Sequence, residues 1–500
     1  SHESENYDRF TAKRINFDQQ ENMSLQLGSA QDQNAWSEGN QWTINSFFSR
    51  VNYTFANKYV IEGTIRADGS SRFDPDHRWG WFPGVNVAWR VGEEGFMKRL
   101  GWFEDLKVRA SYGEMGNQSG IGLYDYIQLI SLSNDYYPFG TGVKGQMATS
   151  GNIISTSRTW ETIQTTNVGF DFSTLNNRLY GSFDYFWKEN KNMLIPKTYP
   201  SMLGADAPST NSGHLSIHGW EISLGWRDQI KDFSYSVRFN ISDAKNKVVD
   251  RVGSNLIQLG NNETPTGYPL NSYFGYEFDG IIQNEQELEA YKSRFSEGGI
   301  PGDLSVGDAM YKDLDGDGKL SVLGDGKEGS GDVKYLGDKN PRYNFGFNLS
   351  MAWKGFDLSA FIQGVGRRTM FLEGESRCPM PEAWYQSAEY WYGKTWTPER
   401  TDAQYPAITL KDKRNYNYYV STNTKFNVAY ARLKNLQFGY TIPQTLTSKA
   451  GLQKVRVYFS GEDLFEVHNT PNGWDPEENS GSITSYPFTR NYSFGINVVF

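Results

Sequence analysis

The last ten residues of the chain, Asn491–Phe500, read NYSFGINVVF and alternate between two kinds of side chain. One set is apolar and consists of Tyr492, Phe494, Ile496, Val498 and Phe500. The other set is small or polar and consists of Asn491, Ser493, Gly495 and Asn497. Because successive side chains of a β-strand point to opposite faces, this period of two predicts a strand with one apolar face and one polar face.

The same period recurs along the whole chain in roughly fifteen segments, many of them near the roughly 9–11 residues of a tilted membrane-spanning strand. Clear examples are Leu106–Tyr112, Leu179–Trp187, Tyr235–Ile241, Tyr343–Leu349, Leu436–Tyr440 and Val455–Phe459. Helical periodicity is scarce, and the two candidates, Gln286–Phe295 and Pro381–Trp391, lie between predicted strands. We therefore expect an all-β, antiparallel fold with helices confined to its loops.

Composition excludes several classes of protein. The 500 residues include 49 Lys and Arg against 58 Asp and Glu, and the net charge of -9 argues against nucleic acid as a partner. The single cysteine, Cys378, excludes a disulfide framework and a cysteine-based zinc site. The mean hydropathy is -0.63, and the longest apolar run, Val428–Ala431, is far shorter than the roughly 20 residues of a membrane helix. Ser1–Glu5 has neither the basic start nor the apolar core of a signal peptide.

The alternating pattern has two interpretations at this point. A soluble β-protein turns its apolar faces inward, whereas an outer-membrane barrel turns them outward to lipid and its polar faces to the lumen. Tryptophans placed near predicted strand ends, at Trp187, Trp226 and Trp353, favour the membrane interpretation. Short turns at Asn176–Asn177 and Lys354–Gly355 also favour it, because they alternate with long connections. The long connections are predicted at about 114–160, 189–216, 243–272, 284–340 and 364–425.

A series of sequence strings, in a fixed order, resembles a known family. They include ADGSSRF (67–73), HRWGWFP (77–83), LKVRASYG (106–113), WETIQTTNVGFDF (160–172), YFGYEFDGIIQN (273–284), DLDGDGKL (313–320), WTPERTDAQYP (396–406), RLKNLQFGYTIP (432–443) and GEDLF (461–465). Together they resemble the C-terminal half of a SusC-type TonB-dependent outer-membrane transporter of Bacteroidota, from about residue 20 to residue 500. The resemblance implies that residues 1–500 form part of a single barrel domain.

The resemblance also implies partners. Barrels of this type close with roughly 22 strands around a plug, so we expect this chain to pair with N-terminal strands and a plug that it does not show, and to contact TonB through that missing part. A SusD-like surface lipoprotein would act as a lid, outer-membrane lipid would surround the wall, and the cargo would be an oligosaccharide or a peptide. The alternative is a soluble or surface-attached β-protein that binds or hydrolyses glycans.

An acidic turn in the 284–340 connection resembles the first half of an EF-hand calcium loop. Asp313, Asp315 and Asp317 occupy alternate positions, Gly318 follows, and the Lys319 carbonyl and Ser321 continue the ligand spacing. The position of the usual bidentate glutamate holds Gly324, with Asp325 next. These residues predict either a structural Ca²⁺ site or an acidic turn held by hydrogen bonds alone.

Other candidate residues carry weaker patterns. Aromatic loop residues suit capture of a substrate or contact with a lid, since rings provide area at low entropic cost; these are Tyr136, Tyr137, Trp384, Tyr385, Trp391 and Tyr418. His214 and His218 share a face of a predicted strand, and Cys378 has no histidine near it in sequence, so we expect neither a metal site nor a reactive thiol. The sequence contains no GxSxG, HExxH or phosphate-loop motif, and we expect no enzyme activity and no organic cofactor. By the resemblance, Tyr492, Phe494, Ile496, Val498 and Phe500 form the outer-membrane insertion signal.

Overall fold

The computed structural model describes most of the chain. The described residues are 1–17, 24–29, 31, 33–133, 138–139, 143–144, 147–151, 153–196, 202, 208–251, 259–260, 264–323, 331–381, 386–409, 412–478, 481, 486 and 488–500. Among them, no α-helix has the length and apolar character needed to cross a bilayer.

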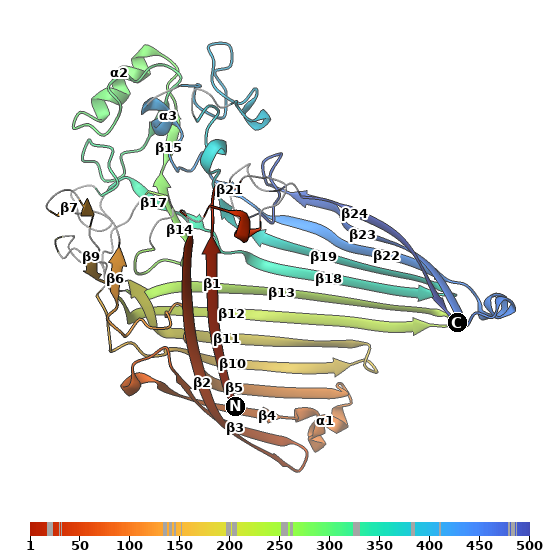
Figure 1. The fold of residues 1–500 in the computed structure, drawn as a ribbon. Coiled ribbons are helices and arrows are strands. Elements are labelled where there is room, and N and C mark those ends of the chain that lie inside the picture. The colour runs from red at the N-terminus through yellow and green to blue at the C-terminus, as the bar shows by residue number, and fades with distance from the viewer. Residues whose placement is uncertain are drawn as a thin grey trace.

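One antiparallel sheet of 14 strands dominates the fold (Figure 1), as the alternating segments predict. Each strand pairs with the next long strand along the chain. In spatial order the strands are β1 (His2–Lys13), β2 (Asn34–Phe55), β3 (Tyr59–Ser70), β4 (Trp79–Trp89), β5 (Asp105–Asn117), β10 (Glu161–Thr174), β11 (Leu179–Pro196), β12 (Ser209–Ile230), β13 (Phe233–Asp250), β18 (Arg342–Trp353), β19 (Phe356–Arg367), β22 (Tyr430–Thr441), β23 (Lys454–His468) and β24 (Asn491–Val499).

The connections at one end of the sheet are short. Lys354 and Gly355 form a two-residue hairpin turn with φ angles of 46° and 90°, the left-handed conformation of a type I′ turn. Leu175–Arg178 joins β10 to β11, and Asn176 and Asn177 both have φ of 59°. Both predicted short turns are therefore confirmed. The helix α1 (Gly95–Leu100) and the C-terminus lie at this same end (Figure 1).

The connections at the other end are long and carry the small elements. The 118–160 connection contains β6 (Ile130–Ser133), β7 (Pro138–Phe139), β8 (Val143–Lys144) and β9 (Met147–Ser150). The 251–341 connection contains β14 (Ser272–Tyr276), β15 (Phe278–Ile281), α2 (Glu285–Arg294), β16 (Ala309–Tyr311) and β17 (Val333–Asp338). The 368–429 connection contains β20 (Thr369–Met370), α3 (Asp412–Asn417) and β21 (Phe426–Asn427), and α4 (Gln444–Thr447) follows β22 at the short-turn end.

Two predictions about the long connections are wrong. Residues 189–216 are mostly strand, because β11 and β12 remain paired beyond the point where the apolar alternation stops. Backbone pairing needs only register, so the end of an apolar face need not be the end of a strand. For the same reason Trp187 lies in the middle of β11 rather than near its end. The predicted loops 243–272 and 284–340 belong to one connection, because Ser272–Ile281 pairs outside the large sheet.

The two helix predictions have different outcomes. The segment Gln286–Phe295 is confirmed as α2, whose N-cap Asn284 accepts a hydrogen bond from the Glu287 N–H. Pro381–Trp391 is wrong as a helix over its described part, which contains only a 3₁₀ turn at Glu389–Trp391. Gly393, with φ of 74°, follows this turn, and the Tyr390 and Trp391 rings pack into a cluster of aromatic side chains.

The large sheet keeps apolar and polar side chains on separate faces. Cross-strand neighbours share a face, and Phe239 lies opposite Leu224 on β12 and Phe347 on β18. The apolar face is widely exposed, with Phe47 on β2 and Phe494 on β24 exposed by 68% and 84%. Among the described residues the buried apolar clusters lie largely in the long connections, and no packed core covers the apolar face of the sheet. Such a face needs an apolar surrounding, which a bilayer provides.

Candidate functional site

Ion pairs between neighbouring strands line the polar face of the sheet. On β5 the Arg109 guanidinium lies 2.5 Å from an oxygen of Asp184 and 3.2 Å from an oxygen of Asp171. On β23 Arg456 donates to Asp357 over 2.9 Å. These pairs give each charged group a partner within the 14-stranded sheet, which we call the wall. They also give its polar face a fixed pattern of hydrogen-bond donors and acceptors.

The connection between β23 and β24, residues 469–490, is fastened to the wall by two arginines. Arg432 on β22 is 1% exposed, and its guanidinium lies 2.5 Å from Asp475 and 3.2 Å from Glu477. The ring of Phe488 lies 4.2 Å from the same guanidinium. Arg368 donates to the carbonyls of Pro476 and Glu478, each over 2.8 Å. The segment 475–478 is therefore held against the wall at the end where the long connections gather.

The long connections 251–341 and 368–429 gather at the same end of the sheet (Figure 1). They share a buried, largely aromatic cluster, and we call the two connections joined by this cluster the outer body. Its centre is Tyr311, whose N–H donates to the Tyr291 hydroxyl over 2.9 Å and whose hydroxyl donates to the Tyr416 carbonyl over 2.7 Å. Burial raises the pKa of Tyr291 to about 12. Tyr311 and Tyr416 are likewise buried, and burial raises the pKa of each phenol well above its ordinary value.

An ion pair fixes the base of the outer body. Glu277, between β14 and β15, lies 2.7 Å from Lys312 and also pairs with Lys334 on β17. The hydrogen bonds from these two lysines lower the pKa of Glu277 to about 2. The carboxylate is therefore ionised at every physiological pH and links two small sheets.

A second cluster contains two of the predicted contact residues. Trp391 and Tyr418 are 3% and 2% exposed and pack with Tyr405 and Cys378. The Tyr418 hydroxyl donates to the Pro406 carbonyl over 3.0 Å. In this conformation both rings hold the loops together, so contact of these two residues with a substrate or a lid stays a prediction that requires the cluster to open. Burial also raises the pKa of the Cys378 thiol, which suits a packing role.

The next residue along, Tyr392, has the opposite environment. Its side chain is 90% exposed beside the buried Trp391. The alternation of one buried and one exposed ring was not visible in the sequence, because the 3₁₀ turn that separates them gives no periodic pattern. The other predicted contact residues, Tyr136, Tyr137, Trp384 and Tyr385, lie outside the described residues.

The acidic turn brings the predicted metal ligands together. One carboxylate oxygen from each of Asp313, Asp315 and Asp317 lies within 4.8 Å of the others. The Asp313 carboxylate also accepts the Gly316 and Gly318 N–H groups over 2.6 Å and 3.0 Å. Lys319 and Ser321 follow in the same turn, and Asp325 lies outside the described residues. A hard cation fits this oxygen-only cluster, and Ca²⁺ binding stays a prediction.

Sequence spacing missed the residue that closes this turn. Asp332 is fully buried and accepts the Leu314 N–H over 2.6 Å and the Ser321 N–H over 2.8 Å. Burial raises its pKa, and the nearby Asp315 and Asp313 carboxylates raise it further. Asp332 follows a glycine-rich stretch and lies well beyond the EF-hand spacing, so only the fold reveals its position.

Two further predictions concern strand residues. His214 Nε2 lies 2.5 Å from a carboxylate oxygen of Glu189. Neither His214 nor His218 belongs to a group of three or more metal-ligating side chains among the described residues, where the acidic turn is the only such group. The five side chains of the predicted insertion signal, Tyr492 to Phe500, lie exposed on and just beyond β24. Their role as a signal stays a prediction.

Residues 2–464 match the protein family described as TonB dependent receptor-like, beta-barrel. A TonB-dependent receptor of Formosa agariphila is 32% identical over 490 residues, which cover 92% of this chain and 46% of that protein. The TonB-dependent receptor SusC of Bacteroides thetaiotaomicron is 26% identical over 497 residues, which cover 94% of this chain and 45% of SusC. The chain spans about half the length of these curated relatives.

Among solved structures, the fold matches that of the RagAB peptide transporter. The TM-score is 0.79 at 22% identity, and the match covers 99% of this chain and 52% of the transporter chain. The family has transporters and not enzymes among its members, and they reside in the outer membrane. The exposed apolar face of the sheet is thus a lipid-facing wall, its short turns are periplasmic, and its long connections are extracellular. The chain belongs to the TonB-dependent receptor-like β-barrel family.

Proposed function

We propose that this chain forms the greater part of the wall of a SusC-like importer that carries oligosaccharides or oligopeptides across the outer membrane. Two relatives support this class: SusC, which matches 94% of this chain, and the RagAB peptide transporter, whose fold this chain shares. Membership of a family of outer-membrane β-barrel transporters argues against the alternative of a soluble or surface-attached β-protein that binds or hydrolyses glycans.

The outer body is the observation that carries the proposal. Long extracellular connections in a simple pore could remain loose, but here two of them share a buried core of tyrosines. A rigid rim of this kind suits a partner that closes repeatedly on the same surface, because binding to a preorganised surface does not require the loss of conformational entropy that ordering loops would cost. We therefore propose a SusD-like surface lipoprotein as the lid, with TonB acting through the plug of the complete transporter.

Tyr392 is the residue best placed to test the lid. An exposed aromatic ring on a rigid support has the properties of an interface anchor. Tyr392→Ala removes the ring from the surface. The matched control is Tyr53→Ala, which removes an exposed ring from the lipid-facing wall. Both variants leave the buried tyrosine network intact.

The experiment is mass spectrometry of every polypeptide that co-purifies with the transporter from detergent-extracted outer membranes. We expect a surface lipoprotein in stoichiometric amount with wild type and Tyr53→Ala, and less of it with Tyr392→Ala. Uptake of labelled oligosaccharides and of labelled oligopeptides by cells that produce the transporter would then separate the two cargo classes. Recovery of the transporter without any lipoprotein would reject the lid, and absence of uptake of both cargo classes would reject the importer.

A further inference from the structure

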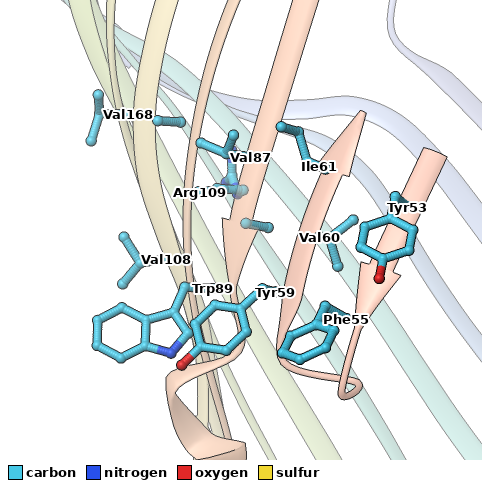
Figure 2. Close-up of a pocket in the computed structure, with 12 residues that line it drawn as sticks. Tyr53, Phe55, Tyr59, Val60, Ile61, Val87, Trp89, Val108, Arg109 and Val168 are labelled. Atoms are coloured by element: carbon cyan, nitrogen blue, oxygen red, sulfur yellow. The ribbon is translucent and has the colours of Figure 1, made fainter. Parts of the chain in front are cut away.

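A groove of about 450 Å³ lies on the lipid-facing side of the wall, where β2, β3, β4, β5 and β10 run side by side (Figure 2). Its size falls within the roughly 300–1,000 Å³ of ordinary small-molecule sites. The side chains that border it on the lipid side include Tyr53, Ile61, Val87, Val108, Ala110 and Val168. The border is almost wholly apolar, so the groove suits a hydrocarbon occupant.

A small residue on β5 accounts for the hollow. Ala110 lies between Val87 on β4 and Val168 on β10 in the strand register. A short side chain flanked by two branched ones leaves a trough in the apolar surface.

A row of aromatic rings borders the periplasmic end of the groove (Figure 2). The rings of Phe55 and Tyr59 stack with centroids 6.4 Å apart, and those of Tyr59 and Trp89 stack at the same spacing. The Tyr59 hydroxyl and the Trp89 indole N–H both donate to Glu94, over 2.7 Å and 3.2 Å. Rings with an apolar body and an anchored polar tip mark the boundary between hydrocarbon and headgroups.

The turn next to this row is basic. Lys58 together with the 90–104 connection carries four cations and three carboxylates, a net charge of +1. Lys58 pairs with Glu94 and Lys98 pairs with Glu93, whereas Arg99 has no ion-pair partner within the described part of the chain. Arg99 lies on α1, the helix that begins directly after Glu94. Exposed Phe96 and Trp102 flank the arginine in sequence and suit an interfacial position.

We propose that this groove binds one acyl chain of a glycerophospholipid from the periplasmic leaflet, with the lipid phosphate at Arg99. The position of the groove selects the lipid, because it opens to the bilayer at the short-turn end of the wall. The order of features along the wall also matches a phospholipid. The apolar trough corresponds to the acyl chain, the aromatic border to the edge of the hydrocarbon, and the unpaired Arg99 guanidinium to the phosphate. The bound lipid would fasten β2–β5 to the periplasmic leaflet.

The first test uses variants of the complete transporter. Ala110→Phe fills the trough, and Ala360→Phe makes the same change at another half-buried alanine on the lipid face, where Ala360 lies opposite Leu349 and Leu436. Native mass spectrometry after detergent exchange measures retained phospholipid. We expect Ala110→Phe to lower retention about tenfold, since displacing two methylene groups has about that effect. Arg99→Gln should lower retention of the intact lipid, and Ala360→Phe should not.

The second test uses the wild-type transporter and a phospholipid with a diazirine on one acyl chain. Irradiation should label residues of the groove, such as Val87 and Val108, more heavily than lipid-facing residues of β18 and β19. Equal retention in wild type and Ala110→Phe, or equal loss in Ala360→Phe, would overturn the proposal in favour of a general lipid annulus. A retained lipopolysaccharide in place of phospholipid, or uniform labelling around the wall, would also overturn it.

Discussion

The hydroxyl groups of Tyr291 and Tyr416 lie 2.7 Å apart, although 125 residues separate them along the chain. Tyr291 comes from α2 in the 251–341 connection, and Tyr416 comes from α3 in the 368–429 connection. Their contact joins the two largest extracellular segments across β18 and β19, which lie between them in the sequence. The outer body is therefore a unit whose stability can be measured apart from that of the wall.

Tyr291→Phe should loosen the outer body. The substitution leaves the buried Tyr311 N–H and the Tyr416 hydroxyl without their partner, which costs about 1–3 kcal/mol. Hydrogen exchange should speed up in the outer body and stay unchanged in the wall strands. Tyr392→Phe, which removes an exposed hydroxyl, is the control and should change neither. Unchanged protection in Tyr291→Phe would mean that the ring packing alone holds the two connections together.

Arg432→Met should release the 469–490 segment from the wall. The change leaves Asp475 without its buried cation and leaves Glu477 paired with Lys434 alone, and breaking a buried ion pair costs about 3–5 kcal/mol. Limited proteolysis of intact cells should cleave the variant within this segment and spare the wild type. Arg9→Met, at an exposed pair with Glu38, should behave as wild type. Equal resistance of Arg432→Met would contradict the fastening role.

Glu277 predicts how the outer body responds to acid. Its pKa of about 2 in the folded protein lies below the ordinary carboxylate value, so its ion pairs contribute stability fully at neutral pH. That contribution should decline only as the pH falls from about 4.5 towards 2. Protection of 272–281, 309–323 and 331–336, measured by hydrogen exchange and corrected for intrinsic rates, should show this decline. Glu277→Gln should have lower protection at neutral pH and no decline over the same range.

Calcium should bind at the acidic turn through Asp313, Asp315 and Asp317. Asp317→Asn removes one charged ligand and should weaken binding measured by isothermal titration with CaCl₂, while the fold of the wall stays intact. Ca²⁺ should also offset the repulsion that raises the Asp332 pKa, so protection of the turn should rise on adding it. Identical titrations for wild type and Asp317→Asn would identify the turn as one held by hydrogen bonds alone.

Cys378 reports on whether Trp391 and Tyr418 ever become accessible. The thiol is 1% exposed, and its pKa is raised by burial, so maleimide should not label it in the resting transporter. A cysteine introduced at the exposed Ser387 should be labelled at once and serves as the positive control. Labelling of Cys378 that appears only with cargo present would show that the cluster opens and would support contact of Trp391 and Tyr418 with cargo.

The strands were predictable because their pattern has a local cause. Each lipid-facing residue, such as Phe494 or Phe239, is separated from the next by one polar residue, and this period of two follows from the geometry of a single strand. The point at which the apolar alternation stops can also be read from the local sequence. That point marks the edge of the hydrocarbon, whereas the backbone pairing of the strands continues beyond it. Residues 189–216 were misread as a loop for that reason.

The outer body was not predictable because its contacts are distant in the sequence. Nothing local distinguishes the buried Trp391 from the exposed Tyr392, and Asp332 joins the acidic turn only through the fold. By contrast, Asp313, Asp315 and Asp317 lie within one turn, so their spacing alone predicted that their carboxylates would converge.

The strictly sequential order of the 14 strands has a consequence for how such walls diversify. Each new strand pairs with its predecessor whether the connection is the two residues Lys354–Gly355 or the whole of 251–341. The entropic free-energy cost of closing a loop rises only slowly with loop length, by roughly 0.6 kcal/mol for each doubling. Insertions can therefore accumulate at one end of the sheet while the register of the wall is inherited unchanged, and the extracellular surface can evolve independently of the structure that carries it.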